Sequence, residues 1–237
     1  MRPGYVGPSR GYPVTILGKL RPGLTGASRN FTTPQSTVGG SQGRGYFSNV
    51  PADPSKSDSP VLLRGKLLIA DPSLRDGTFD RSVILLTSHG PEEGAAGLIL
   101  NHPTGKVVGD FLKGGEFAAL RHLAVHQGGP VMCEQMTFSS FWWSRKLGLR
   151  WAMRLSAKQA AEHARRPGRI VRAFIGYSGW SAGQLENELR RHSWFPISPR
   201  PDLLGHTHDR RLWAILLRGM SPLHRILAEA PEHPYLN

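Results

Sequence analysis

Blocks of apolar residues separated by polar turns predict a fold rich in β-strands. The stretch from Gly65 to Pro103 holds three such blocks, with Gly, Pro and charged residues between them. We expect strands at 66–70, 82–88 and 96–101. The unbroken apolar run from Val83 to Leu86 is typical of a strand covered on both faces. The short loop before Ala96 predicts an antiparallel hairpin between the second and third strands.

The rest of the chain alternates between strands and short helices. We expect strands at 138–143, 149–155 and 170–177, and extended structure again at Trp194 and Phe195. Ser156 and Gln159 form a capping-box pattern at the start of an alanine-rich helix, which Gly168 stops. Further short helices are expected at 108–112, after the turn at Pro103, and at 116–122, 212–217 and 221–229.

Ser181 and Gln184 repeat the capping-box pattern and predict a second capped helix. Leu185 would face the core, and Glu186 would pair outward with Arg190 one turn later. The pair Gly128-Gly129 before Pro130 is a weak candidate for a phosphate loop. Because it lacks the lysine that reaches phosphate oxygens, we favour a tight connection between two elements.

Residues 1–60 show no sustained period of 2 or 3.6 and contain no acid before Asp53. Their Gly-, Pro-, Ser- and Thr-rich composition buries too little apolar surface to offset the entropy of ordering. We therefore expect a disordered N-terminal extension at 1–60 and a single domain at 61–237. The acid-poor composition is also typical of organelle transit peptides. A third interpretation is a start codon placed too far upstream.

Deleting residues 1–60 is expected to leave the melting temperature essentially unchanged, because the segment lacks a patterned apolar face. Thermal unfolding of the full-length and shortened proteins checks this. A loss of more than a few degrees, roughly 1 kcal/mol for a domain of this size, would show that the segment packs on the domain.

Composition limits the classes of function. No apolar run approaches the roughly 20 residues that span a bilayer, so we expect no membrane association. The single Cys133 excludes an intramolecular disulfide and suits a reducing compartment, which predicts a cytoplasmic protein. The net charge of +13 is spread along the chain. It predicts weak, sequence-independent and salt-dependent attraction to nucleic acid.

Three groups of side chains are weak candidates for chemistry. Asp71, Asp76, Asp80 and Arg81 share one loop and could form an acid–base or metal site, although turn formation with an ion pair is the favoured interpretation. Ser82 with His89 offers a nucleophile and a base, but no Gly-x-Ser-x-Gly elbow supports it.

The third group, His206, His208 and Asp209, has spacing that suits a metal. A closed site needs further ligands, and the pattern does not place His122, His126 and His192. We favour an exposed polar loop and expect no metal or cofactor. Five tryptophans could stack on nucleic-acid bases, but their apolar neighbours favour core packing. These are Trp142, Trp143, Trp180, Trp194 and Trp213.

The turn around Trp180 is the strongest candidate site. Gly176, Gly179 and Gly183 surround Tyr177 and Trp180 between a strand and a helix. Such glycines permit a positive φ or close backbone approach, and we expect strain if Gly179 is replaced. Capping alone explains part of this pattern. The alternative is a polar concavity for a small ligand or a partner segment. That site would comprise Asp76, Arg81, Asn101, Tyr177, Trp180, Gln184 and Glu186.

Three sequence blocks, taken in order and spacing, resemble the AlgH/YqgE family of small bacterial proteins, also found in plant plastids. They are LLIADPSLRDGTFDRSVILLTSHGPEEGAAGLILNHP at 67–103, GGPV at 128–131, and FIGYSGWSAGQLENELRRHSWF at 174–195 followed by Leu212-Trp213. The resemblance covers about residues 62–220. It departs at His102, where Arg or Lys is usual, and at Ser181, where Gly is common.

The resemblance implies an α+β fold of bifurcated, strongly coiled, mainly antiparallel sheets with flanking helices in a single compact domain. Some members are called transcriptional regulators, without a recognisable DNA-binding motif. We therefore expect a binding or regulatory protein with an unidentified protein or small-molecule partner. One alternative is an enzyme, a hydrolase or a nucleotide- or flavin-using protein, with its site at the Trp180 turn. The other is a non-specific nucleic-acid binder.

Overall fold

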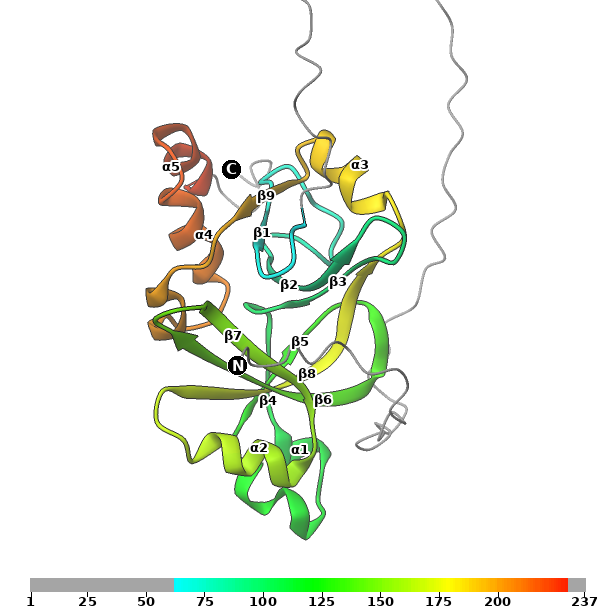
Figure 1. Ribbon diagram of the computed structural model, residues 1–237, viewed down its shortest axis with the longest axis vertical. Coiled ribbons are helices and arrows are strands. Elements are labelled where there is room, and N and C mark those ends of the chain that lie inside the picture. The colour runs from blue at the N-terminus through cyan, green and yellow to red at the C-terminus, as the bar shows by residue number, and fades with distance from the viewer. Residues whose placement is uncertain (1–61, 230–237) are drawn as a thin grey trace, which may run out of the picture. The chain divides into compact units, whose positions relative to one another are not determined.

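The strands of the domain form one mixed sheet that curls into a half-barrel with helices at its flanks (Figure 1). The computed structural model describes residues 62–229. The expectations for residues 1–60 lie outside the described residues and stay predictions. Within 62–229 the strands follow the order β4-β5-β8-β3-β2-β1-β9, and β6 pairs with β7 and β8. The expected α+β fold is confirmed.

The first part of the sheet is built from the N-terminal apolar blocks. It contains β1 (Leu67–Ala70), β2 (Val83–Gly90) and β3 (Gly94–Ile99), and β9 (Trp194–Ile197) returns to pair with β1. The β2–β3 pair is the predicted antiparallel hairpin. Leu67–Ala70 and Val83–Leu86 are fully buried, as the apolar run predicts. These strands form the centre of the larger hydrophobic core.

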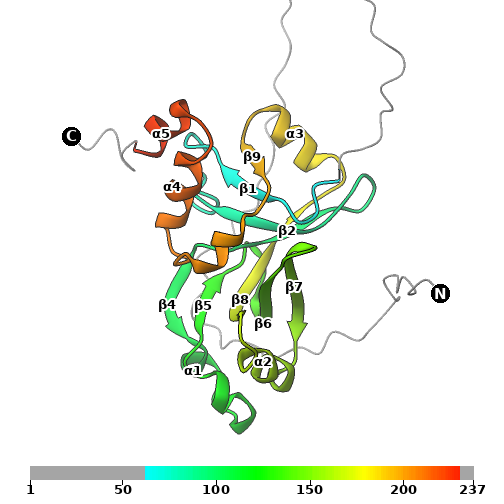
Figure 2. The same ribbon diagram turned by 60° about the vertical axis from the view of Figure 1, so that its left-hand side comes forward.

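The second part of the sheet comprises β4 (Pro103–Val107), β5 (Ala124–Gln127), β6 (Val131–Ser144) and β7 (Gly148–Leu155). Figure 2 shows them on the other side of β2 and β3 from β1 and β9. β4 and β5 were not predicted from the sequence, which suggested only a turn at Pro103 before a short helix at 108–112; that helix is present at Val108–Phe111. β4 reads PTGKV and is mostly exposed, so it carries no apolar signal. Pairing with β5 makes it a strand.

β8 (Arg169–Trp180) joins the two parts. Its C-terminal end pairs with β3 at Ala95↔Trp180, and its N-terminal two thirds pair with β6 and with β5. The β5–β8 pairing is parallel, which makes the sheet mixed. The bifurcation implied by the family resemblance therefore lies along a single strand.

Glycines allow the backbones to cross closely where the sheet divides. A Cβ on Gly176 would lie 2.4 Å from the Gly129 carbonyl oxygen and 2.8 Å from that of Val131. Gly128 accepts a hydrogen bond from the Ile99 amide (2.9 Å) and donates one to Ile175 (2.8 Å). The Gly-Gly pair is thus a tight connection between β5 and β6 that also contacts β3 and β8.

Gly179 does not have the strain that the sequence suggested. Its φ is not positive, and an added Cβ would meet only Tyr177 and Val131 side-chain atoms at 3.4 Å and 3.6 Å. Gly176 (φ 66°) and Gly183 (φ 73°) are the residues of this turn with positive φ.

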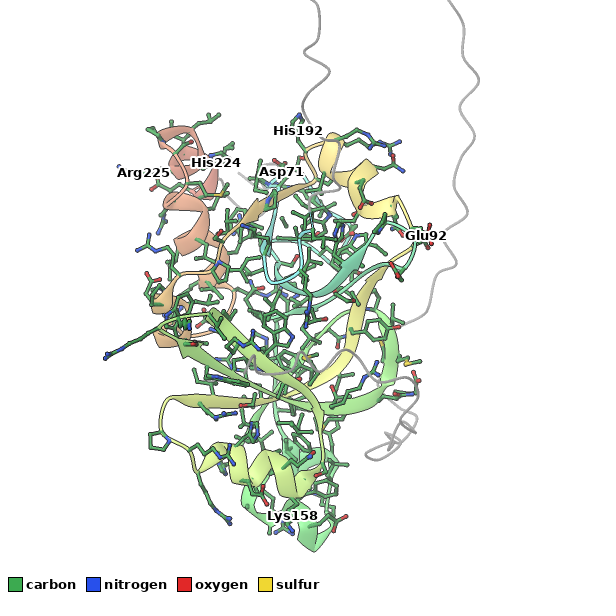
Figure 3. The ribbon with its side chains drawn as sticks, in the orientation of Figure 1. Asp71, Glu92, Lys158, His192, His224 and Arg225 are labelled. Atoms are coloured by element: carbon green, nitrogen blue, oxygen red, sulfur yellow. The ribbon has the colours of Figure 1, made fainter. Side chains whose placement is uncertain are left out.

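The helices lie at the flanks of the sheet. They are α1 (Val108–Phe111), α2 (Ala157–Ala164), α3 (Gln184–Arg190), α4 (Arg211–Arg218) and α5 (Pro222–Ala228), with 3₁₀ turns η1 (Gly115–Leu120) and η2 (Pro201–Gly205). Trp213 of α4 donates its indole N–H to the Ala70 carbonyl (2.8 Å). His224 lies on α5 (Figure 3). Its ring packs edge-on against Phe195 of β9, with 4.7 Å between the ring centroids.

The two predicted capping boxes have different outcomes. At α2 both hydrogen bonds form, between Ser156 Oγ and the Gln159 amide (3.2 Å) and between Gln159 Oε1 and the Ser156 amide (2.9 Å). α3 begins later than predicted, at Gln184, after an N-cap glycine with positive φ. Only the Gln184 half of that box is present: its Oε1 accepts from the Ser181 amide at 3.1 Å.

None of the helices that the structure describes is long and apolar enough to cross a membrane.

Candidate functional site

The acidic loop between β1 and β2 uses its carboxylates to form turns. Asp76 Oδ1 accepts from the Thr78 and Phe79 amides at 2.9 Å and 2.7 Å. Asp80 Oδ1 accepts from the Gly77 amide at 3.1 Å, and Asp71 Oδ1 accepts from the Ser73 amide at 2.8 Å. The carboxylates therefore form turns, which is the interpretation that the sequence analysis favoured over a metal or acid–base site.

Asn101 is fully buried and ties β3 to the start of β2. Its Oδ1 accepts from the Val83 amide (2.8 Å), and its Nδ2 donates to the Arg81 carbonyl (2.9 Å). Arg81 has φ 51°, and its guanidinium carbon lies 5.1 Å from the centroid of the Trp213 ring. The side chain of Asn101 thus supplies hydrogen bonds between the end of β3 and the start of β2, where the positive φ of Arg81 interrupts the regular strand.

Glu186 pairs with a residue of β2 instead of with Arg190. Its Oε1 lies 2.9 Å from His89 Nε2, and His89 Nδ1 accepts from the Leu63 amide at 3.2 Å. His89 must therefore carry its proton on Nε2 and donate it to Glu186. Arg190 donates to Asn187 Oδ1 instead. Ser82 and His89 lie at opposite ends of β2, on the order of 20 Å apart by strand rise, and do not form a nucleophile–base pair.

The Trp180 turn converges on Glu188, a residue that the sequence analysis did not single out. Glu188 Oε2 accepts from the indole N–H groups of Trp180 (2.8 Å) and Trp194 (2.7 Å). Its Oε1 accepts from Gln184 Nε2 at 3.0 Å. Phe79 of the acidic loop stacks on Trp180 with centroids 6.4 Å apart. The sequence analysis expected Glu186 to be the interacting acid of this helix, and the capping-box pattern gives no signal for Glu188.

The structure thus brings together Trp180, Gln184 and the acidic loop, and places Asn101 and Arg81 at the start of β2. Tyr177 is half-buried against the larger core. The observed bonds of these side chains hold the fold together. Their joint action as a polar concavity stays a prediction.

His208 corrects the expectation of an exposed histidine loop. It is 4% exposed, and its Nε2 lies 2.9 Å from the Leu203 carbonyl. His206 instead approaches Asp202 (3.9 Å), and Asp209 pairs with Arg211 (2.6 Å). The three side chains therefore point to different partners. Among residues 62–229, no group of three or more His, Cys, Asp or Glu side chains could hold a metal ion.

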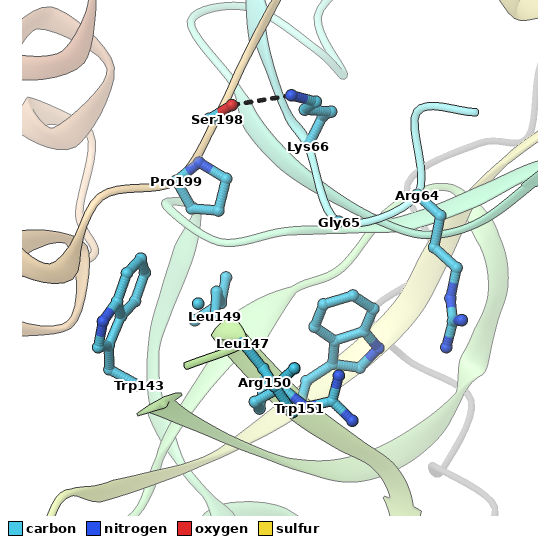
Figure 4. A pocket seen from close by; sticks show the side chains of 11 residues that line it. Arg64, Gly65, Lys66, Trp143, Leu147, Leu149, Arg150, Trp151, Ser198 and Pro199 are labelled. Carbon is cyan, nitrogen blue, oxygen red and sulfur yellow. Dashed lines mark hydrogen bonds between the residues drawn. The ribbon is translucent and has the colours of Figure 1, made fainter. Parts of the chain in front are cut away.

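A pocket of about 440 Å³ lies between the start of β1, the β6–β7 hairpin and the segment after β9 (Figure 4). We call it the hairpin pocket. Its lining is Arg64, Gly65, Lys66, Trp143, Leu147, Gly148, Leu149, Arg150, Trp151, Ser198 and Pro199. Among the residues that the structure describes, the lining contains three cationic side chains and no carboxylate.

The hairpin register places the two tryptophans of this pocket. Trp143 pairs with Leu149 and Phe141 pairs with Trp151, so Trp143 and Trp151 are diagonal neighbours on one face. Figure 4 shows their rings on opposite sides of the pocket with Leu149 between them. Arg64 lies over the Trp151 ring, with its guanidinium carbon 5.6 Å from the centroid. Two flat apolar surfaces therefore face a space lined by positive charge.

The sequence analysis favoured core packing for five tryptophans, which include Trp143 but not Trp151. Trp180, Trp194 and Trp213 are buried as expected, whereas Trp143 and Trp151 are half-buried. Trp142 is also half-buried and stacks with Arg169, 3.9 Å from its ring centroid. The alternation of the hairpin places Trp143 and Trp151 on one face, but only the arrival of Arg64–Lys66 and Ser198 makes that face a pocket.

Comparisons with known proteins agree with this fold. The AlgH-like family model matches residues 67–224. A UPF0301 protein of Streptomyces avermitilis is 34% identical over 187 residues, covering 74% of this chain and 95% of the relative. A UPF0301 protein of Bacteroides thetaiotaomicron is 30% identical over 202 residues, covering 80% and 100%.

Two solved structures share the arrangement of the domain. The solution structure of the AlgH protein from Pseudomonas aeruginosa has a TM-score of 0.53 at 29% identity, covering 74% of this chain and 98% of that one. A crystal structure of a protein from Corynebacterium diphtheriae has a TM-score of 0.55 at 21% identity, covering 70% and 91%. The second likeness supports the fold alone.

Proposed function

The chain belongs to the AlgH-like family, and from this premise we propose that it is a binding protein that takes an anionic ligand with a flat ring in the hairpin pocket. The observation that carries the proposal is the lining: Arg64 and Lys66 lie beside a space between two tryptophan rings, Arg150 of β7 also lines that space, and no carboxylate among residues 62–229 does. A volume near 440 Å³ lies within the roughly 300–1,000 Å³ of small-molecule sites.

The chemistry of the lining selects the ligand class. Tryptophan faces stack on flat rings and contribute about 1–3 kcal/mol for each nucleobase in other proteins. Lys66 and Arg150 offer charged donors, which bind phosphate and carboxylate oxygens more strongly than neutral donors do. A phosphorylated nucleoside combines both features. We therefore expect mononucleotides to bind better than nucleosides or inorganic phosphate.

The lining favours binding over catalysis. Its described residues include no carboxylate, imidazole or thiol that would act as a general acid or base. Lys66 Nζ does donate to Ser198 Oγ at 2.8 Å, the geometry of a serine–lysine pair. A lysine acts as a base only when neutral, which burial promotes. Because this contact is exposed, we assign Lys66 the role of a charged donor.

A binding titration tests the proposal. We expect calorimetry to show binding of nucleoside mono- and diphosphates. Arg150→Gln and Lys66→Gln should each weaken that binding about tenfold, which corresponds to 1.4 kcal/mol. Arg145→Gln is the matched control, since Arg145 is exposed on the same hairpin and does not line the pocket. No binding by any nucleotide, or equal affinity in Arg150→Gln, would contradict the proposal.

We further propose that any regulatory role acts in the cytoplasm through this ligand or a partner protein. The sequence offers charge but no recognition helix, so attraction to DNA would be non-specific. Single-stranded oligonucleotides in the same titration separate the two alternatives. An affinity that increases with strand length and falls steeply with salt would indicate non-specific binding to nucleic acid. A mononucleotide that binds as tightly as an oligonucleotide would indicate binding in the hairpin pocket.

A further inference from the structure

A group of basic and polar side chains lies on one face of β5, β8 and β6, apart from the lining of the hairpin pocket. We call it the basic cluster; it consists of His126, Ser139, Arg172 and His208. Arg172 of this group is half-buried, with its Nη1 atom enclosed. His126 and His208 are each 4% exposed, and Ser139 is fully buried. Four of their atoms have no hydrogen-bond partner in the described part of the chain: His126 Nδ1, Ser139 Oγ, Arg172 Nη1 and His208 Nδ1.

Strand register places these side chains together. His126 pairs with Phe174, and the two rings are 5.7 Å apart. Arg172 is two residues before Phe174, so it extends from the same face of β8. Ser139 is directly opposite Arg172 on β6. The backbone carbonyl of His208 lies 3.2 Å from His126 Nε2, which places the segment between η2 and α4 over this face.

The hydrogen bonds fix where the two histidines carry their protons. His126 Nε2 faces the His208 carbonyl, and His208 Nε2 faces the Leu203 carbonyl at 2.9 Å. Because a carbonyl only accepts, each Nε2 must be the protonated nitrogen. Burial, reinforced by Arg172, lowers the pKa of His126 to about 4 and that of His208 to about 3. At neutral pH both Nδ1 atoms are therefore lone-pair acceptors.

Arg172, in contrast to the two histidines, is a charged donor that needs an acceptor. Burial lowers its pKa to about 10, so the guanidinium stays charged at neutral pH. No carboxylate among residues 62–229 forms an ion pair with it or counteracts that shift. A buried charge without a partner costs several kcal/mol. The cluster thus presents a cation that needs an anion, beside two acceptors that need a donor.

Other charged groups near the cluster, among residues 62–229, do not supply that anion. Arg210 lowers the pKa of His102, and His206 lowers the pKa of His208, so both favour the neutral histidine. Asp80 raises the pKa of His102, which is outside the cluster, and its Oδ1 already accepts from the Gly77 amide.

We infer that Arg172, Ser139, His126 and His208 bind a small oxyanion that still carries a proton, such as hydrogen phosphate or hydrogen carbonate. Its unprotonated oxygens accept from Arg172 and from the Ser139 hydroxyl. Its O–H group donates to the Nδ1 atom of His126 or His208. Sulfate, which carries no proton at neutral pH, would meet two lone pairs and bind poorly. The inference does not depend on the hairpin pocket.

The test compares phosphate with sulfate at constant ionic strength. Both anions strengthen burial non-specifically, so sulfate is the matched control. At pH 7.5 we expect 10 mM phosphate to raise the melting temperature by about 3 °C more than sulfate does. Two-dimensional NMR of ¹⁵N-labelled histidine should show shifted Nδ1 resonances of His126 and His208 on adding phosphate, and none on adding sulfate.

Variants separate this site from the rest of the protein. Arg172→Gln should abolish the phosphate response without lowering stability in its absence, because it removes the buried charge. Ser139→Ala should weaken phosphate binding, and Arg145→Gln, at an exposed position of the β6–β7 hairpin that lines neither the cluster nor the hairpin pocket, should leave it unchanged. Near pH 5 the preference over sulfate should shrink as the histidines begin to take up protons. Equal effects of the two anions at pH 7.5, or a full response in Arg172→Gln, would overturn the inference.

Discussion

Gly176→Ala is expected to lower the free energy of unfolding by more than about 3 kcal/mol, beyond the ~1 kcal/mol typical of point changes. The new Cβ would lie 2.4 Å from the carbonyl oxygen of Gly129, between β5 and β6, and 2.8 Å from that of Val131, at the start of β6. Real Cβ atoms do not approach so closely, and backbone atoms cannot rotate away as a flexible side chain does. The residue also has φ 66°, which adds strain for any residue with a Cβ.

Gly179→Ala is the matched control in the same strand. Its φ is ordinary, and the nearest atoms to its new Cβ are side-chain carbons at 3.4 Å or more. We expect a change within about 0.5 kcal/mol, the range of surface substitutions. Urea unfolding of both variants gives the comparison. Equal stabilities would mean that the crossing of β5, β6 and β8 is looser than described.

The sequence predicts the parts of the fold whose patterns are local. The run Val83–Leu86 and the short loop before β3 are sufficient to predict a buried hairpin strand, and Ser156 with Gln159 predicts where α2 begins. β4 escapes prediction because its exposed polar residues carry no period. Gly179 was chosen over Gly176 because the sequence shows three glycines near one turn, but not which one another backbone approaches.

The side chains that could carry function are brought together by long-range pairing, which the sequence pattern does not show. His126, Arg172 and His208 lie on different elements, and only the parallel β5–β8 register and the segment before α4 unite them. Trp143 and Trp151 were visible as aromatic strand residues, but the pocket also needs Arg64 and Ser198 from elsewhere. Glu188 was missed for the same reason, since its partner Trp194 lies on β9.

Lowering the pH from 7 to about 4.5 should destabilise the protein steeply through His126 and His208. Their folded pKa values are about 4 and about 3, below the ordinary value of 6.5. Between roughly pH 6.5 and 4 the unfolded chain therefore binds protons that the folded chain does not. Stability falls as pH falls, by about 1.4 kcal/mol per pH unit for each histidine. Burial also lowers the pKa of His102, which acts in the same direction.

Glutamine variants isolate this effect. His126→Gln and His208→Gln keep an N–H donor for the facing carbonyls but take up no proton. In a phosphate-free buffer, urea unfolding at several pH values should give a slope smaller by about 1.4 kcal/mol per pH unit for each substitution. Asp209, whose pKa is lowered by its hydrogen bond to Arg211, is common to all these proteins and cancels in the comparison. An unchanged slope in the double variant would mean that both histidines become protonated without unfolding, in which case the face that carries Arg172 is open to solvent.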